Sequence, residues 1–407
     1  MKLKVRLSEK LHLTPGISIM LILMAWGGIV ALIRYVYGIG AVSNLNDTYS
    51  WAFWISFDLF CGVALGSGAF TMAAIIHIFE IERFKPLLRP SILTGFLGYV
   101  MVIVALLVDL GRPERIWHMI VYQNHHSVLF EIGICVMTYT TVLAIEFAPV
   151  LFEGLRLPKI ARTLHRIVIP FVILGVVLST LHQSSLGGLL LIQGNSLHPL
   201  WWTPILPFLF FVSAIVVGLG MVILESSLSS RAFHRGLEID LLSELAKYIP
   251  YGLGIYLLLK FGDLAYFGDL KYLFSSGGMS ALFWLEIIVG AIVPIVLFTQ
   301  AKIRNNDNGL LIASIFVVLG LMINRFNVSW FAVEHIRNLP LAPTFMTQTS
   351  YFPSFMEVSV SVGIVAAGVF VFTMAAKYLP LFEGEAETAV YEPIPQVPQQ
   401  VQVQTGD

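Results

Sequence analysis

The sequence predicts an all-α polytopic membrane protein with about ten transmembrane helices. Of its 407 residues, 57% are hydrophobic and 12% are charged, which is too apolar for a soluble globular chain. Runs of about 20 apolar residues, the length of helix that crosses a bilayer, recur from one end of the chain to the other. Membrane β-barrels instead show short segments in which apolar and polar residues alternate, and the sequence has no such series.

Ten apolar runs define the expected spans, each close to ~20 residues long. The spans are expected at about 17–37, 52–78, 91–110, 128–151, 167–191, 201–225, 248–267, 280–300, 308–326 and 355–378. The seventh is the least certain to cross on composition alone, because Lys260 and Asp263 lie near one end of it.

The distribution of basic residues predicts the orientation of these spans. With the N-terminus in the cytoplasm, most of the 24 Lys and Arg residues fall in inner loops or at inner helix ends, as the positive-inside rule requires. An even number of spans then places both termini in the cytoplasm. No cleavable signal is expected, because the first span is too long for the apolar part of a signal peptide. Residues 1–383 are expected to form one transmembrane domain, and the Pro-, Gln- and Glu-rich segment 384–407 a disordered cytoplasmic tail.

Composition argues against several functions. A net charge of −1 does not suit a nucleic-acid partner. Cys61 and Cys135 both fall in expected spans, so neither a disulfide framework nor a thiolate metal site is predicted. Haem iron needs axial ligands such as histidine. Only His182 lies deep in a span, and His77 falls at a different depth, so we predict no haem.

Ionisable residues inside the spans are the main functional signal, because a charge in hydrocarbon costs about 2.5–3.5 kcal/mol even on an insertion-based scale. A series of titratable groups from one membrane face to the other is what a proton route requires. From the outer to the inner side, the expected series is Asp109, Arg112 and Arg325, then Asp58, Glu131, Glu286 and Glu357, then Tyr99 and His182, then Glu146, Glu225 and His77.

Each of these groups also has a structural interpretation. Those near helix ends would equally form ion pairs between helices or reach the aqueous interface. Function is favoured for Glu131 and His182, which are expected far from water and in polar company. Glu131 and Glu146 fall close to one helix face at about 100° per residue. His182 opens the polar stretch His-Gln-Ser-Ser in an aliphatic span, and an imidazole titrates near neutrality and passes protons through either nitrogen.

The glycines beside Asp58 have two interpretations. Small residues such as Gly62, Gly66 and Gly68 let helices pack closely in a membrane. Alternatively, the missing side chains leave a slot for a flat ring. The sequence leaves both interpretations open.

Several outer segments are rich in aromatic and polar residues. Interfacial Trp and Tyr are ordinary membrane anchors, but these segments also look structured, and 327–354 is expected to form a long outer loop suited to docking an extrinsic protein. The segments are Asp109-Leu-Gly-Arg-Pro with Trp117-His118, His198-Pro-Leu-Trp201, Asn324-Arg325-Phe-Asn327, and Tyr351-Phe-Pro-Ser354 before Glu357.

Together with His182-Gln-Ser-Ser-Leu-Gly187, these segments carry a resemblance over about residues 10–380. The chain resembles the NrfD/PsrC family, the integral membrane subunits of polysulfide-reductase-like respiratory complexes. Within that family it is most similar to the ten-span branch found in hydrogenase-2-type nickel–iron hydrogenases.

The resemblance implies two four-helix bundles, made of spans two to five and six to nine, with spans one and ten flanking them. It also implies a location in the bacterial inner membrane and a quinone site near the outer surface, with menaquinone favoured over ubiquinone. The chain itself would hold no haem, iron–sulfur cluster or metal. A periplasmic, ferredoxin-like iron–sulfur subunit would dock there and connect it to a catalytic subunit such as a nickel–iron hydrogenase.

By the same resemblance, two sets of residues are expected to carry the function. Glu131, His182, Tyr99 and Glu225 are expected to transfer protons. Asp58, Asp109, Arg112 and Arg325 are expected to line or order the quinone site.

The expected function is therefore a quinone-reactive anchor subunit that has no catalytic centre of its own. If the protons for quinone reduction come from the cytoplasm, turnover also moves charge across the membrane. Polysulfide, sulfite, nitrite or menaquinone reductase complexes are alternatives to the hydrogenase. An ion-coupled secondary transporter is a further alternative, although transporters have Gly- or Pro-broken helices that meet at mid-membrane and most glycines and prolines here lie near span ends. A third alternative is a haem b electron carrier.

Overall fold

The computed structural model describes residues 14–45, 53–192, 194, 197–332 and 351–382, and the regular elements in this part of the chain are all helical. Nine helices in it are long and apolar enough to cross a membrane, which confirms an all-α polytopic membrane protein. The expected seventh span forms helix α10 (Tyr248–Phe267), which is not one of the nine. Lys260, Asp263 and its tyrosines lower its hydropathy, yet it packs among the other helices. The expected tail, 384–407, lies outside the described residues.

The first bundle contains the second to fifth spans, packed as a closed set of four in which each helix contacts both neighbours. Its first member is a composite span of several short pieces. The elements are η3 (Ile55–Cys61), α2 (Gly62–Leu65), α3 (Gly68–Ala73) and η4 (Ala74–Ile78), then α4 (Leu88–Asp109), α6 (Val128–Gly154) and α7 (Pro158–Leu191).

The second bundle contains the sixth to ninth spans in the same alternating order, again with contacts around a closed set of four. Its elements are α8 (Leu206–Phe233), α10, the composite span α12 (Gly278–Ile287), η9 (Ile288–Ile292) and α13 (Val293–Thr299), and α15 (Asp307–Phe326) continued by η10 (Asn327–Phe331).

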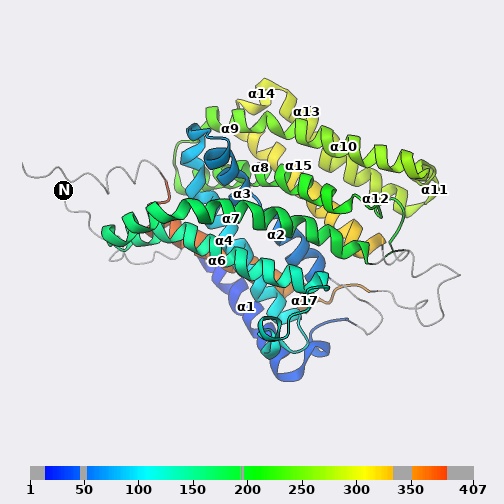
Figure 1. Cartoon of the computed structure of the whole chain (residues 1–407), viewed down its shortest axis with the longest axis horizontal. Coiled ribbons are helices and arrows are strands. Elements are labelled where there is room, and N and C mark those ends of the chain that lie inside the picture. The colour runs from blue at the N-terminus through cyan, green and yellow to red at the C-terminus, as the bar shows by residue number, and fades with distance from the viewer. Residues whose placement is uncertain (1–13, 46–52, 193, 195–196, 333–350, 383–407) are drawn as a thin grey trace, which may run out of the picture.

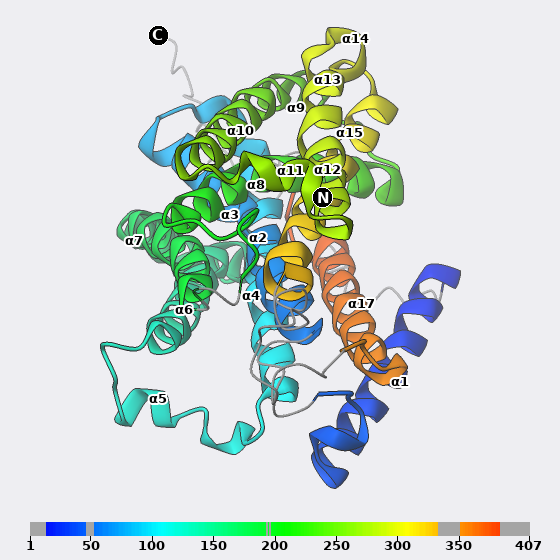
Figure 2. The ribbon, with the colours of Figure 1, turned by 90° about the vertical axis from the view of Figure 1, so that its right-hand side faces the viewer.

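The first and last spans form a pair that flanks the first bundle. Helix α1 (Pro15–Tyr37) and helix α17 (Phe355–Tyr378) lie side by side, and α17 also packs on α4. Figures 1 and 2 show this pair at the opposite edge of the molecule from α10 and α13. The close approach requires glycine, because a Cβ atom on Gly27 would lie 2.9 Å from the Cα atom of Gly363. The flanking position predicted for these spans is confirmed.

Short helices and turns connect the spans at the two ends of the bundles. We call one end the Trp201 end, after the loop that joins α7 to α8, and the other the Glu153 end, after the last turn of α6. At the Glu153 end, Arg83 pairs with Glu244 and Arg231 pairs with Asp307. The connecting elements are η2 (Ile39–Ala41), η5 (Glu82–Leu87), η6 (Pro113–Arg115), α5 (His118–Val121), α9 (Ile239–Ala246), η8 (Asp269–Lys271), α11 (Tyr272–Ser275) and α14 (Ala301–Arg304).

The first helix of each bundle meets the other at the centre of the molecule. Ser67 donates a hydrogen bond of 2.6 Å to the carbonyl oxygen of Ala214 on α8. A Cβ atom on Gly218 would lie 2.8 Å from the Ser67 hydroxyl, so only glycine fits there. At the level of this contact the composite span has a turn, at Gly66 and Ser67.

The expected outer loop 327–354 begins later than predicted. Residues 327–331 continue α15 as a π-helix, and helix extends to Ala332. The prediction of a loop from 327 is therefore wrong, because the polar side chains there are satisfied inside the protein. Asn327 donates to Glu286 at 2.9 Å, and Ser329 donates to the Ser56 hydroxyl at 2.7 Å. Residues 333–350, including His335, lie outside the described part.

Candidate functional site

A cavity of about 300 Å³ lies between the first bundle, α8 and α17. Its walls are almost entirely apolar, and four of its lining positions are glycines. It is lined by Phe57, Asp58, Cys61, Gly62, Leu65, Gly66, Thr94, Leu97, Gly98, Met101, Val102, Met221, Glu225, Leu228, Ser229, Ile364, Val365, Gly368, Val369 and Phe372.

All three glycines of the cluster are in close helix packing, the first of the two interpretations. Gly68 packs against α8, with its Cβ position 3.2 Å from the carbonyl oxygen of Gly218. Gly62 and Gly66 pack against α4, where a Cβ atom would lie 2.9 Å from Val102 and 3.2 Å from Tyr99, and both also line the cavity. A slot for a flat ring stays a prediction.

The cavity is elongated along the helix axes. Ser67 and Ala214 mark a common level, because they are hydrogen-bonded. Asp58 lies about two and a half turns from Ser67 toward the Trp201 end, and Glu225 lies about three turns from Ala214 toward the Glu153 end. A carboxyl group therefore stands near each end of a long apolar space.

One carboxyl group, Asp58, is held by a single hydroxyl. The Ser361 hydroxyl of α17 donates to Asp58 Oδ2 at 2.6 Å, and Asp58 is 7% exposed. Asp58 lies in the π-helical segment η3, and such segments frequently mark functional sites in helical proteins. At the other end, Glu225 accepts a longer hydrogen bond of 3.4 Å from Ser229.

The structure brings only one of the four predicted quinone residues to this cavity. Asp58 lines it, whereas Asp109 is the last residue of α4. Arg112 is exposed in the loop that carries α5, which stands away from the helical body in Figure 2. Arg325 is buried against α8 in the second bundle, with its guanidinium carbon 3.7 Å from the centroid of the Phe210 ring.

A second polar group fills the middle of the first bundle. The Tyr99 ring centroid lies 4.7 Å from that of Tyr139 and 5.7 Å from that of His182. The hydroxyls of both tyrosines and of Ser179, and both His182 ring nitrogens, are buried and form no hydrogen bond to a described protein atom. Buried polar atoms of this kind normally bind ordered water. We call Tyr99, Tyr139, Ser179 and His182 the tyrosine–histidine group.

Titratable residues extend from this group toward both ends of the bundle along α6. Toward the Trp201 end, Glu131 accepts a hydrogen bond of 2.5 Å from Ser185. Toward the Glu153 end, Glu146 packs on α7, because a Cβ atom on Gly175 would lie 2.7 Å from Glu146 Oε1. At that end, Glu153 bonds to Arg89 at 2.9 Å and to His165 at 2.8 Å.

Two predictions about this series need correction. Glu131 was expected far from water, but it lies in the first turn of α6 and is exposed. Glu225 was expected in one series with Glu146, but it lines the cavity on α8, whereas Glu146 faces α7. Tyr139 and Ser179 were not predicted as site residues. Spacing along the helix was a usable signal for Tyr139, which lies about two turns from Glu131 and from Glu146 on α6.

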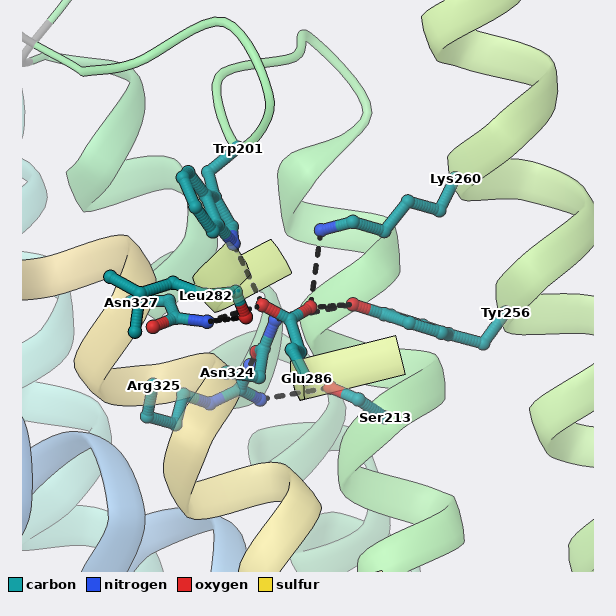
Figure 3. A network of polar contacts seen from close by, with 9 residues as sticks. All are labelled: Trp201, Ser213, Tyr256, Lys260, Leu282, Glu286, Asn324, Arg325 and Asn327. Atoms are coloured by element: carbon teal, nitrogen blue, oxygen red, sulfur yellow. Dashed lines mark hydrogen bonds and ion pairs between the residues drawn. The ribbon is translucent and has the colours of Figure 1, made fainter. Parts of the chain in front are cut away.

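The second bundle contains a dense polar network around Glu286, drawn in Figure 3. The Glu286 carboxylate accepts hydrogen bonds from Trp201 Nε1 at 2.7 Å, Asn324 Nδ2 at 2.8 Å and Asn327 Nδ2 at 2.9 Å. It also accepts from the Tyr256 hydroxyl at 3.4 Å, and Lys260 Nζ lies 3.3 Å away in a buried ion pair. A carboxylate offers about four lone-pair sites, so these donors occupy it fully.

The second bundle's network was not predicted as a site. Glu286 and Lys260 were each noted in the sequence, but the pairing joins two helices that only the fold brings together. Arg325 belongs to the same region, since it donates to Asn324 Oδ1 at 2.7 Å and to the Ser213 hydroxyl at 2.9 Å. The arrangement suits a fixed internal anion with its counter-ion.

Within the described residues, His77 and His182 are not placed to bind one haem iron between them. Gln183 donates to the Val63 carbonyl at 3.0 Å. The neighbouring His182 therefore lies at about the same depth as Val63 of the composite span. His77 lies about four turns, or about 20 Å, further along that span, too far to share an iron with His182. Within the described residues, no three His, Cys, Asp or Glu side chains are placed to hold a metal ion. Cys61 and Cys135 are both free and buried.

Fold and site together define a class: multi-pass membrane proteins built from two four-helix bundles, with ionisable groups buried inside and a cavity beside them. The chain belongs to the NrfD family, because the sequence model described as "Polysulphide reductase, NrfD" matches residues 41–332. The family membership expected from the sequence is confirmed.

Three relatives cover nearly the whole chain. The chain is 39% identical to a protein of Nitratidesulfovibrio vulgaris, over 92% of this chain and 96% of that one. It is 32% identical to the probable Ni/Fe-hydrogenase 2 b-type cytochrome subunit of Escherichia coli, over 86% and 87%. It is 31% identical to the integral membrane subunit of menaquinone reductase from Nitratidesulfovibrio vulgaris, over 90% and 91%.

Proposed function

We propose that this protein is the quinone-reactive membrane subunit of a respiratory oxidoreductase complex. The observation that carries the proposal is the elongated apolar cavity with the buried carboxyl of Asp58 near its Trp201 end. Leu228, Val365 and Val369 lie on its rim and are each about half exposed on the face that a bilayer covers. A lipid-soluble carrier enters such a site sideways from the membrane.

The chemistry at the site is two-electron reduction of a quinone or oxidation of the quinol. Reduction adds two electrons and two protons to the two carbonyl oxygens, and the reverse step releases them. The protein must supply groups that exchange protons near the ring, and Asp58 is the acidic group in the cavity wall at that end. The electrons come from, or pass to, an iron–sulfur subunit docked at the Trp201 end.

The parent complex is proposed to be a nickel–iron hydrogenase, with the complex in the bacterial inner membrane and the Trp201 end facing the periplasm. The relative from Escherichia coli, which is named as a hydrogenase 2 subunit, supports this choice. The menaquinone reductase subunit supports menaquinone as the carrier and leaves a menaquinone reductase complex as the alternative.

Protons are proposed to reach the quinone end through the first bundle. The tyrosine–histidine group, with Glu146 on one side and Glu131 on the other, spans most of the bundle. Water bound by its unpartnered atoms would connect these groups. Moving one charge against 100 mV costs about 2.3 kcal/mol, which a sufficiently exergonic electron transfer would offset.

The test separates binding from proton transfer in the purified complex. A fluorescent quinone analogue, a hydroxyquinoline N-oxide, is titrated against wild type, Asp58→Asn and Glu131→Gln, and quinone reduction is measured beside dye reduction by the soluble subunits. Asp58→Asn is expected to weaken analogue binding about tenfold, the effect of roughly one lost charge-assisted hydrogen bond. Glu131→Gln is expected to retain binding and to lose quinone reduction, while dye reduction stays intact.

Glu114→Gln is the control, because Glu114 is an exposed acid in the loop at the same end. Saturable binding that is unchanged in Asp58→Asn would remove the cavity from the proposal. Full quinone reduction in Glu131→Gln would remove Glu131 from proton transfer.

An ion-coupled transporter is the second candidate, and the broken composite span at Gly66 and Ser67 favours it. Purification without an iron–sulfur partner, together with substrate uptake in vesicles, would support this candidate against the first.

A further inference from the structure

Helix α17 lies outside the part of the chain that the family's sequence model matches, since the match ends at residue 332. Nevertheless, α17 forms one wall of the cavity. Its contributions are Ile364, Val365, Gly368, Val369 and Phe372. The cavity described above therefore depends on a helix that lies outside the matched segment.

The same helix holds the carboxyl of Asp58. The Ser361 hydroxyl donates to Asp58 Oδ2 at 2.6 Å, and Ser361 is 1% exposed. No other hydrogen bond to the Asp58 side chain occurs within the described residues. Ser361 therefore fixes the direction in which Asp58 presents its second oxygen.

Several contacts at its start keep α17 in place. Ser354 and Glu357 form a capping box, in which Glu357 accepts from the Ser354 backbone at 2.7 Å. Glu357 also accepts from the Tyr351 hydroxyl, and Trp54 Nε1 donates to the Glu357 carbonyl at 3.0 Å. With the Gly27–Gly363 contact to α1, these bonds give Ser361 a fixed position.

Further along α17, Gly368 leaves the middle of the cavity open. A Cβ atom there would lie 3.4 Å from Met101 Cγ, an ordinary contact, so packing alone does not require glycine. Val365 and Val369, on either side of Gly368 along the helix, are 48% and 51% exposed. The cavity thus opens beside α17 toward the lipid, and a larger side chain at Gly368 would narrow it.

From these observations we propose that α17 completes a binding groove for the long apolar chain of a membrane-soluble redox carrier. Ser361 is a positioning residue for Asp58 at the ring end, and Gly368 provides space for the chain. This inference rests on the proposed function, and it assigns to α17 the recognition of the carrier's isoprenoid tail. The acyl chain of an ordinary phospholipid has the same apolar chemistry, and the experiment distinguishes the two.

The experiment compares two quinones in the assembled complex: menaquinone with four isoprene units, and menadione, which has the same ring without a tail. Gly368→Leu is expected to raise KM for the long-tailed quinone about tenfold, the effect of roughly two lost methylene contacts. For menadione, KM is expected to stay within about twofold. Val371→Leu, on the lipid face of α17 and outside the cavity, is the matched control.

The ring end is tested with a matched pair of serines on one helix. Ser361→Ala is expected to lower kcat several-fold for both quinones, because Asp58 loses its positioning bond. Ser359→Ala is expected to leave kcat for both quinones unchanged, because within the described residues the Ser359 hydroxyl donates to the Phe355 carbonyl of its own helix. Gly368→Ala, which the 3.4 Å contact accommodates, serves if the leucine variant does not assemble.

The outcomes are distinguishable. An unchanged ratio of KM values for the two quinones in Gly368→Leu and Gly368→Ala would overturn the proposal and leave a phospholipid chain as the occupant. Equal losses in Ser361→Ala and Ser359→Ala would show a structural role for α17 only, and would also overturn it. If the wild-type complex reduces neither quinone, the proposed function fails first, independently of α17.

Discussion

The first and second bundles place the same kinds of side chain on corresponding helices. The second helix of each bundle carries a tyrosine, Tyr99 or Tyr256, and the third carries a glutamate, Glu131 or Glu286. The fourth helices carry polar residues at the same relative spacing. His182, Gln183 and Ser185 on α7 correspond in order to Asn324, Arg325 and Asn327 on α15 and η10.

The contacts of these residues correspond as well. Ser185 and Asn327 each donate to the glutamate of their own bundle, at 2.5 Å and 2.9 Å. Gln183 and Arg325 each donate to a backbone carbonyl on the first helix of their bundle, at 3.0 Å and 3.4 Å. Two copies of one polar arrangement therefore exist in the molecule.

The copies differ in how completely their polar atoms are satisfied. Glu286 accepts from four side chains and is paired with Lys260, one turn after Tyr256. The position one turn after Tyr99 is Ile103, so the first bundle has no such cation. Its tyrosines and His182 keep free hydrogen-bonding atoms within the described protein. We call the second bundle's arrangement, held by charge pairing, the locked copy. We call the first bundle's arrangement, whose buried polar atoms have no hydrogen-bond partner in the described protein, the open copy.

Removing the cation of the locked copy is expected to have the largest effect on stability. Lys260→Met leaves Glu286 as a buried charge without its cation, which typically costs about 3–5 kcal/mol. The free energy of unfolding in mixed detergent micelles is expected to fall by about that amount. Lys260→Met with Glu286→Gln should recover most of the loss, because both charges are gone and the acceptor remains.

Lys271→Met is the control for this measurement, since Lys271 is an exposed lysine at the same end of the molecule. A Lys260→Met protein as stable as wild type would show that the pair does not hold the second bundle together.

Hydropathy predicted the fold well because the bilayer dictates it. The last span was expected at 355–378 and forms α17 over the same residues, since a long apolar run with a Ser354 cap has one stable outcome in lipid. The ninth span was predicted too short. Asn327 and Ser329 resemble loop residues in the sequence, but their partners Glu286 and Ser56 lie on other helices.

The candidate site was predicted less well, because depth and partners depend on packing. His182 was expected to be buried, and it is 0% exposed. Glu131 was expected far from water, yet it lies in the first turn of α6 and is exposed. The cavity requires α17 to pack against α4 and to share a cavity wall with α8, and no local pattern in the sequence specifies that arrangement.

Replacing the histidine of the open copy should affect turnover far more than stability. His182→Phe keeps a buried ring but removes two nitrogens that have no protein partner. Quinone reduction by the complex is expected to fall about a hundredfold, the usual contribution of a group that transfers protons. The unfolding free energy should change by less than about 1 kcal/mol, because no hydrogen bond within the protein is lost.

Asn324→Leu tests the corresponding position in the locked copy, where the opposite result is expected. It removes donors to Glu286 and Tyr256, so stability should fall by about 2 kcal/mol while turnover per folded complex is retained. Equal turnover in His182→Phe and wild type would show that the open copy carries no protons.

The smallest effect on stability is expected from one substitution, tyrosine to phenylalanine, made in each of the two copies. Tyr256→Phe removes a hydroxyl that accepts from Asn324 at 3.2 Å and donates to Glu286, so stability should fall by about 1 kcal/mol. Tyr139→Phe removes a hydroxyl with no hydrogen bond to the described protein, so stability should change by less than about 0.5 kcal/mol. The free energy of unfolding of both variants is measured in mixed micelles. A larger loss of stability for Tyr139→Phe than for Tyr256→Phe would mean that bound water holds the Tyr139 hydroxyl as firmly as Glu286 holds that of Tyr256. In that case the two bundles would no longer differ in how firmly their polar groups are held.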